Sequence, residues 1–310
     1  MRLSIHLAVT SALLAAGSTA HASGLSFDIT YTQAVMNDPN YTQIENAVNY
    51  VTGLYSSLFS NNVTLNFTID ENNSTGLSKN APSRQFSNFN QIVTALGSDG
   101  ANVFLPSTDP TAGLGIGGWE ITTAEAKALG IPLTMQLPTA SDGTMTFNPD
   151  PNGPNQPGYT FDPANQAVPG EYDFIAAVEH EFSEMMGRDS QLRFSALEPY
   201  DLFRFTAPGV RSFSVTAQNV YFSVNDGTTN LETFNWNPSG DIMDWKGDVA
   251  NDPFNAFGVE GQGYVLNSVD LLSMNAIGWE SAAPEPSSVI PAVLGFGLIV
   301  AVVRRRRPKP

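Results

Sequence analysis

The chain has 310 residues, no cysteine and a formal net charge of −16 at pH 7. Nucleic acid is an unfavourable partner for such an acidic chain, because a polyanion is bound through Lys and Arg, and the lack of cysteine excludes disulfides. Between residues 23 and 281 the sequence contains only eight of the 14 Lys and Arg but 29 of the 30 Asp and Glu, so this region offers carboxylates to cations.

The first 22 residues are typical of a secretory signal peptide. They contain a single arginine, Arg2, an apolar stretch over residues 7–16, and small side chains at Ala20 and Ala22. This is the order and spacing that a signal peptidase accepts. We therefore expect cleavage after residue 22 and export of the rest of the chain.

The region that follows predicts a strand, a long helix and a second strand. Residues 25–32 alternate apolar and polar side chains, and residues 63–70 return to the same period of two. Between them apolar side chains recur at helical spacing, at Ile44, Val48, Val51, Leu54, Tyr55 and Leu58. Because a crossover helix of this kind places its two strands parallel in one sheet, we expect a mixed α/β fold.

The middle of the chain alternates loops with short elements. Residues 72–83 are rich in Asn, Ser, Gly and Pro and predict a loop. Helices are expected over residues 85–97 and 123–130, each ended by a glycine, and a strand over residues 144–147. A long loop rich in Pro, Asn and Gly follows this strand and leads to residue 173.

The segment AAVEHEFSEMMGR, residues 176–188, predicts an amphipathic helix with reactive side chains on its polar face. The core-facing apolar side chains are Phe174, Ile175, Val178, Phe182, Met185 and Met186. On the opposite face His180 and Glu184 lie one turn apart, so both can reach one point. Small residues surround them, as on the floor of a cleft. Alternatively, the pair belongs to an ion-pair network with Arg188 and Arg204 that holds no metal.

The spacing is that of a zinc-peptidase helix, HExxH, with Glu184 in place of the second histidine. In such a helix His180 and Glu184 would bind the metal, and Glu181 would be the general base that accepts a proton from water. A carboxylate ligand shifts the preference of the site from Zn²⁺ toward harder cations such as Mn²⁺ or Ca²⁺. Because His6 and His21 leave with the signal peptide, His180 is the only histidine that can bind this metal.

The last third of the chain predicts short strands, a loop and a closing helix. Residues 198–215 and 220–236 carry strand and hairpin signals, with a turn at 225–227. Residues 239–258 are loop-like, and residues 268–280 predict a closing helical segment.

Residues 282–310 have the features of a sorting or anchoring signal. A Pro-Glu-Pro at 284–286 precedes an apolar segment over 289–303, and four arginines follow at 304–307. This order resembles the PEP-CTERM sorting signal of bacteria that make extracellular polymer, which implies export and exosortase-type machinery as partners. The alternative is a tail anchor held by the positive-inside rule. The folded domain is therefore expected over residues 23–281.

Several stretches together resemble a family of exported, PEP-CTERM-sorted bacterial metalloproteases. They are the initial strand, helix and strand, then TMTFNPDPN, YDFIAAVEHEFSEMMGR, YDLFRF and DLLSMNAIGW. The resemblance implies a zincin domain of metzincin-like plan, with a mixed twisted sheet, an active-site helix and a Met-turn-like segment that places Met274 under the metal. Without the resemblance, Met274 would be interpreted as an ordinary methionine of the hydrophobic core.

The third metal ligand is left open by the sequence. Ser190 stands where the metzincin pattern HExxHxxGxxH has its last histidine, and Asp189 misses that position by one residue. Asp201, or Glu198 just before it, would be a third ligand from beyond the helix in the manner of gluzincins. Asp201 can equally pair with Arg204 or cap a turn.

Three functions are compatible with these patterns. The first is a metalloendopeptidase that hydrolyses protein or peptide substrates outside the cell, with Zn²⁺ as its expected cofactor. The second is a zincin-fold protein without catalysis that binds exopolysaccharide or protein in the surface matrix of a Gram-negative bacterium. The third is a calcium-stabilised structural domain, for which the candidate ligands are Asp241, Asp244, Asp248 and Asp252.

Overall fold

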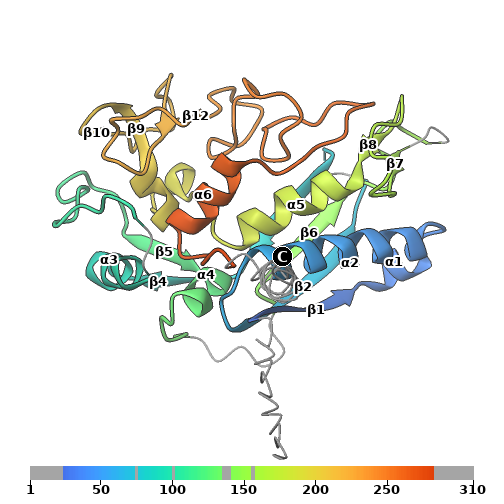
Figure 1. Ribbon diagram of the computed structural model, residues 1–310, viewed down its shortest axis with the longest axis horizontal. Helices are drawn as coiled ribbons and strands as arrows, with labels where there is room; N and C mark the ends of the chain where they lie inside the picture. The colour runs from blue at the N-terminus through green and yellow to red at the C-terminus, as the bar shows by residue number, and fades with distance from the viewer. Residues whose placement is uncertain (1–23, 74–75, 100–101, 135–140, 155–157, 283–310) are drawn as a thin grey trace, which may run out of the picture.

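The computed structural model of the protein describes residues 24–73, 76–99, 102–134, 141–154 and 158–282 (Figure 1). The expected signal peptide and nearly all of the PEP-CTERM-like tail lie outside these residues. Within the described ranges no helix is both long enough and apolar enough to cross a membrane.

The N-terminal half is built on a four-stranded sheet in the order β1-β2-β6-β3. Its strands are β1 Leu25–Tyr31, β2 Val63–Glu71, β3 Ser78–Pro82 and β6 Gly143–Phe147. The first three strands of this order run parallel, and β3 pairs antiparallel with β6 at the edge. The sheet therefore confirms the mixed α/β class and the parallel pairing of the first two strands.

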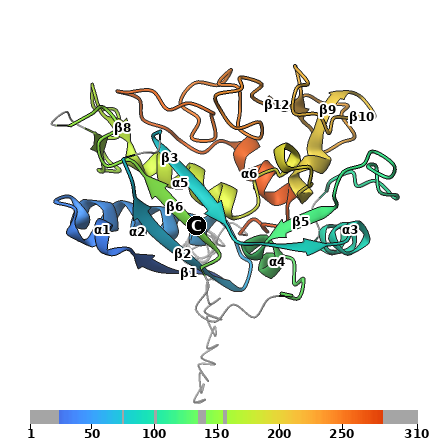
Figure 2. The same ribbon diagram turned by 180° about the vertical axis from the view of Figure 1, so that it is seen from behind.

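Two long helices pack against each other beside this sheet (Figures 1 and 2). They are α2 Tyr41–Leu58, which connects β1 to β2 after the short α1 Gln33–Asn37, and α5 Phe174–Met185. The ring of Phe182 on α5 lies 4.9 Å from that of Phe67 on β2. These aromatic contacts fix α5 on the sheet through its apolar face, which leaves its other face for the site.

Two segments differ from the sequence-based expectation. Residues 72–83 are predicted as a loop, but Ser78–Pro82 forms the edge strand β3. Asn and Pro are tolerated on an edge strand, and the pairing with β6 is a long-range interaction that local composition does not reveal. The helix predicted over 85–97 begins later, because Arg84–Ser87 forms β4 and the Asn88 side chain caps α3 Phe89–Ser98.

The other elements are short. They are β5 Trp119–Thr122, α4 Thr123–Ala128, β7 Tyr159–Thr160, β8 Tyr172–Asp173, two 3₁₀ turns at Leu192–Phe194 and Pro199–Phe203, β9 Arg204–Ala207, β10 Val210–Arg211, β11 Tyr221–Phe222, β12 Glu232–Thr233 and α6 Ser268–Ala276. The last four strands form a small antiparallel sheet in the order β10-β9-β11-β12.

Residues 234–267, between β12 and α6, bring the C-terminal part of the chain back to α5. We call them the returning segment. In Figure 1 it is drawn in orange above α5 and extends toward β8. Trp245 anchors it, because its ring is fully buried and its Nε1 donates to Asp270 Oδ1 at 2.8 Å. This return places residues near position 244 beside the helix that carries the HEFSE motif.

Candidate metal centre

Helix α5 forms the floor of a cleft of about 910 Å³. Asp173 caps the helix, since its Oδ1 accepts hydrogen bonds from the backbone of Ile175 and Ala176 at 3.0 and 3.2 Å. Gly187 ends it with a φ of 113°, in the left-handed region that favours glycine. His180, Glu181 and Glu184 all line the cleft, as the helical spacing predicts for His180 and Glu184.

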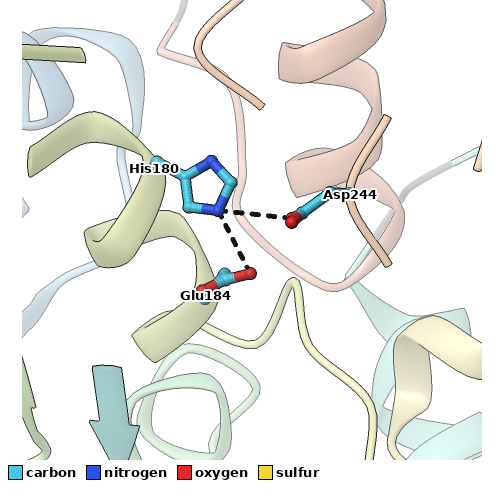
Figure 3. Close-up of side chains that lie close together, drawn as sticks. All are labelled: His180, Glu184 and Asp244. Atoms are coloured by element: carbon cyan, nitrogen blue, oxygen red, sulfur yellow. Dashed lines mark ion pairs between the residues drawn. The ribbon is translucent and has the colours of Figure 1, made fainter. Parts of the chain in front are cut away.

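Three ligand-bearing side chains come together on this floor (Figure 3). His180 and Glu184 come from α5, and Asp244 comes from the segment between β12 and α6. The Nε2 atom of His180 lies 3.4 Å from Glu184 Oε1 and 3.3 Å from Asp244 Oδ1. One ligand atom from each of the three lies within 4.8 Å of the others. We call these three residues the metal group.

The separations in the metal group fit a bound divalent cation. Two ligands of a tetrahedral metal at about 2.1 Å from each are about 3.4 Å apart, whereas a direct N–H···O hydrogen bond is usually about 2.9 Å long. The other ring nitrogen of His180, Nδ1, lies 2.8 Å from the carbonyl oxygen of Pro253. A proton on Nδ1 would leave Nε2 free for a metal, the usual arrangement of a ligating histidine.

Arg188 holds the two carboxylates from behind. Its side chain is fully buried, and Nη1 lies 3.0 Å from Asp244 Oδ1 while Nη2 lies 3.6 Å from Glu184 Oε1. Nε donates to Ser183 Oγ at 2.8 Å, and the guanidinium lies over the ring of Phe254. Arg188 is absent from the cleft lining. It therefore cancels one of the two negative charges without blocking the side of the metal group that faces the cleft.

The electrostatics of the metal group favour a positive charge at its centre. Burial alone would lower the pKa of His180, but the carboxylates of Asp244 and Glu184 raise that pKa well above its ordinary value. Burial raises the pKa of Glu184, and the charge of His180 offsets this only in part. In contrast, His180 and Arg188 outweigh burial at Asp244 and hold the pKa of its carboxyl below the ordinary range. A proton on His180 and a metal ion would therefore compete for the same place.

Glu181 lies beside the metal group on the cleft floor, and Asn80 of the edge strand fixes it. The Asn80 Nδ2 donates to Glu181 Oε2 at 2.7 Å and also to Glu184 Oε2. One amide thus connects β3 with a ligand of the metal group and with the candidate base. The missed edge strand β3 therefore contributes a residue of the candidate site that the sequence patterns do not indicate.

The carboxylates expected as third ligands lie elsewhere. Asp201 caps the turn at 199–203, where its Oδ1 accepts from Ser190 Oγ at 2.8 Å and its Oδ2 from the Glu198 backbone at 2.9 Å. Glu198 and Asp189 both pair with Arg84. None of the three carboxylates belongs to the metal group. The cap and the ion pairs engage these carboxylates, and the third member of the metal group is Asp244 instead.

The sequence does not indicate that Asp244 lies beside His180, because no local motif marks it. The sequence suggests it only as one of four acids in a calcium-stabilised domain. Of the other three, Asp248 pairs with Lys246 at 3.2 Å, and Asp252 accepts from the Phe254 backbone at 2.8 Å. The available signal is its neighbour Trp245, an aromatic residue that anchors the surrounding loop to the core.

Met274 is 1% exposed and belongs to the hydrophobic core. It lies within helix α6 and not in a separate turn, and its carbonyl accepts from the backbone of Trp279 at 3.1 Å. Trp279 in turn donates from Nε1 to the Met186 carbonyl at 2.8 Å. The contacts of this segment thus support the C-terminal end of α5.

Comparisons of the chain with models of protein families, with curated proteins and with solved structures give no match.

Proposed function

We propose that the protein is an exported, metal-dependent peptidase with a zincin-like domain. His180, Glu184 and Asp244 would bind one divalent cation, and Glu181 would act as the general base. The observation that carries the proposal is the 3.3 and 3.4 Å spacing of the two carboxylates around His180 Nε2, with Glu181 next to them in an open cleft. The edge strand β3 alongside α5 supports the zincin plan.

The donor set of one imidazole and two carboxylates suits Zn²⁺ and also Mn²⁺. The cation, when bound, would polarise the scissile carbonyl and make water more acidic. Glu181 would accept the proton of the attacking water as the new C–O bond forms. It would then deliver that proton to the amide nitrogen as the C–N bond breaks, so that the products are a carboxylic acid and an amine.

The backbone of β3 offers a natural place for an extended substrate. Among the described residues this strand pairs on one side alone, with β6. Its residues Ser78–Pro82 line the cleft. An extended peptide can add to a free strand edge through main-chain hydrogen bonds. Asn80 would then keep Glu181 close to the bond that is cleaved. A protein or peptide is therefore the substrate class that the cleft favours.

One observation favours binding without catalysis as a second candidate. Arg188 and a protonated His180 together carry two positive charges, which would neutralise Glu184 and Asp244 with no metal present. In that case the cleft would bind protein or polysaccharide in the surface matrix and hydrolyse nothing.

The substitution Glu181→Gln separates the two candidates. For a peptidase, the variant keeps its bound Zn²⁺ and its melting temperature but loses peptide hydrolysis by about 10²- to 10⁴-fold, because only proton transfer is removed. The exposed Glu260→Gln is the matched control and should match the wild type. Equal hydrolysis by wild type and Glu181→Gln would contradict the role of Glu181, and metal-loaded protein without hydrolysis would favour the binding function.

A further inference from the structure

The cleft over α5 is closed at one end by contact between its two walls. One wall is β3 with Leu77 just before it. The other wall is residues 252–258 of the returning segment. A Cβ atom on Gly258 would lie 2.8 Å from Leu77 Cδ2 and 3.7 Å from Tyr172 Cδ1. A side chain at position 258 would therefore require Leu77 to shift, and the glycine lets the two walls meet beside Tyr172, just before the start of α5.

Both walls are fastened where they meet. The carbonyl of Leu77 accepts a hydrogen bond from Tyr159 Oη at 2.8 Å. Beyond Gly258, the backbone of Tyr264 donates to Asp173 Oδ2 at 3.2 Å, the same carboxylate that caps α5. The closure is thus built from groups bonded to the body of the domain.

The distance from the metal group to this closed end can be gauged along either element. Asp173 lines the cleft seven residues before His180, or about 10 Å along a helix that rises 1.5 Å per residue. Leu77 precedes Asn80 by three residues, again about 10 Å along a strand. An extended substrate advances about 3.3 Å per residue. Both routes leave room for about three substrate residues.

The opposite end of the cleft lies past Glu184 and opens to solvent. Arg193 and Phe194 line it, and Phe194 is 77% exposed. A chain can therefore leave the cleft in this direction but meets the Leu77–Gly258 wall in the other. The two ends of the cleft are unequal.

From this asymmetry we infer that the protein acts near the ends of peptide chains and releases fragments of about three residues or fewer. The inference rests on the proposed peptidase function and specifies where the substrate is cut. The sequence patterns indicate an endopeptidase, whereas the closed end of the cleft favours cleavage near a chain end. The chemistry is unchanged: water supplies OH to the carbonyl carbon and a proton to the amide nitrogen of the bond that breaks.

The test compares linear and cyclic forms of one peptide. The protein, supplied with Zn²⁺, is incubated with a twelve-residue peptide, with its acetylated and amidated forms, and with its head-to-tail cyclic form, and products are followed by mass spectrometry. We expect fragments of three residues or fewer from one end of the linear peptide, at least tenfold faster than any cut in the cyclic form. The blocked forms identify that end.

Two results would overturn the inference, and they differ from failure of the peptidase function. Cleavage of the cyclic peptide at the linear rate, or first cuts more than three residues from both ends, contradicts the chain-end preference while confirming hydrolysis. No cleavage of any form, by protein that contains bound metal, contradicts the peptidase function itself and this inference with it.

A variant tests the wall directly. Leu77→Ala removes the side chain that meets Gly258, so released fragments should become longer. We expect the fraction of released fragments that are longer than three residues to rise tenfold. Leu133→Ala, outside the cleft lining, is the control. Unchanged fragment lengths in folded Leu77→Ala would show that the wall does not limit the substrate. If this variant fails to fold, the wild-type products alone decide.

Discussion

Acidic side chains around the end of α5 differ in role because they differ in partner. Asp244 has His180 and Arg188 as neighbours, so it stays charged and can bind a cation. Asp201 serves as a cap, and Glu198 holds Arg84. A carboxylate is therefore assigned to the metal group by what surrounds it, and not by its distance in sequence from the motif.

Glu125 on α4 has no such partner. Its side chain is fully buried, and neither carboxyl oxygen has a hydrogen-bond partner among the described atoms. It lies against Gly187, where a Cβ atom would be only 2.6 Å from Oε2. Burial and the neighbouring Glu198 raise the pKa of Glu125 well above its ordinary value.

Burial of Glu125 should make the domain less stable as the pH rises, and Glu125→Gln should remove this loss of stability. Below the unfolded-state pKa both states are protonated and the carboxyl has no effect. As the pH rises above that value, the unfolded state loses its proton first, so stability falls, with a limiting slope of about 1.4 kcal/mol per pH unit. Urea denaturation of both proteins at pH 4, 6 and 8 should show the variant gaining relative stability as pH rises.

The exposed Glu260→Gln provides the control, because its pH dependence should match that of the wild type. A stability difference between Glu125→Gln and wild type that stays constant from pH 4 to 8 would mean that Glu125 is ionised when folded.

The sequence identifies part of the site at this scale. Helical spacing predicts that His180 and Glu184 share one face, and the zinc-peptidase motif adds Glu181; all three line the cleft. Asp244 comes from the returning segment, and Asn80 comes from the edge strand β3. Neither has a fixed sequence spacing to the motif, so pattern reasoning favours nearer acids such as Asp201, which a local cap already uses.

At the scale of elements, strongly periodic segments are the predictable ones. The strand, helix and strand at residues 25–71 and the helix α5 follow their apolar periodicity closely. Strand β3 has little such periodicity and owes its form to pairing with β6. Its composition of Ser, Lys, Asn, Ala and Pro suits an exposed edge, which local reasoning cannot distinguish from a loop.

Arg188, three residues past the end of α5, joins this end of the helix to the returning segment through Asp244 and the Met243 carbonyl. Replacing it with Met would leave Glu184 and Asp244 without their shared buried cation, a change that typically costs about 3–5 kcal/mol. Loss of a group that orients metal ligands typically weakens metal binding by about 10- to 100-fold. Arg188→Met should therefore lower both the stability in urea and the Zn²⁺ affinity of the folded fraction.

Arg204→Met is the matched control for this prediction. Arg204 is also buried, but its Nη1 donates to the Ile242 carbonyl at 2.6 Å, outside the metal group. Its loss should reduce stability and leave Zn²⁺ affinity within threefold of wild type. Wild-type Zn²⁺ affinity in Arg188→Met would contradict the positioning role of Arg188.

At the scale of the whole molecule, the metal group joins the two halves of the chain. Residues 25–185 supply the sheet and α5, and the returning segment supplies Asp244 and the carbonyl that contacts His180. A protein without disulfides can gain stability from such a bound ion, by about 2.7 kcal/mol at a free metal concentration of 100 times Kd. Metal binding should therefore raise the melting temperature of the domain.

The most direct measurement is metal content by mass spectrometry, with melting temperature before and after added Zn²⁺. The proteins are wild type, His180→Ala, Asp244→Asn and Asp201→Asn, each purified without chelator. We expect wild type and Asp201→Asn to contain close to one divalent ion per chain and to melt at a higher temperature with Zn²⁺. His180→Ala and Asp244→Asn should contain no such ion and should not respond to Zn²⁺. Wild-type protein with no bound metal and no response to Zn²⁺, or metal retained by Asp244→Asn, would contradict the proposed metal site.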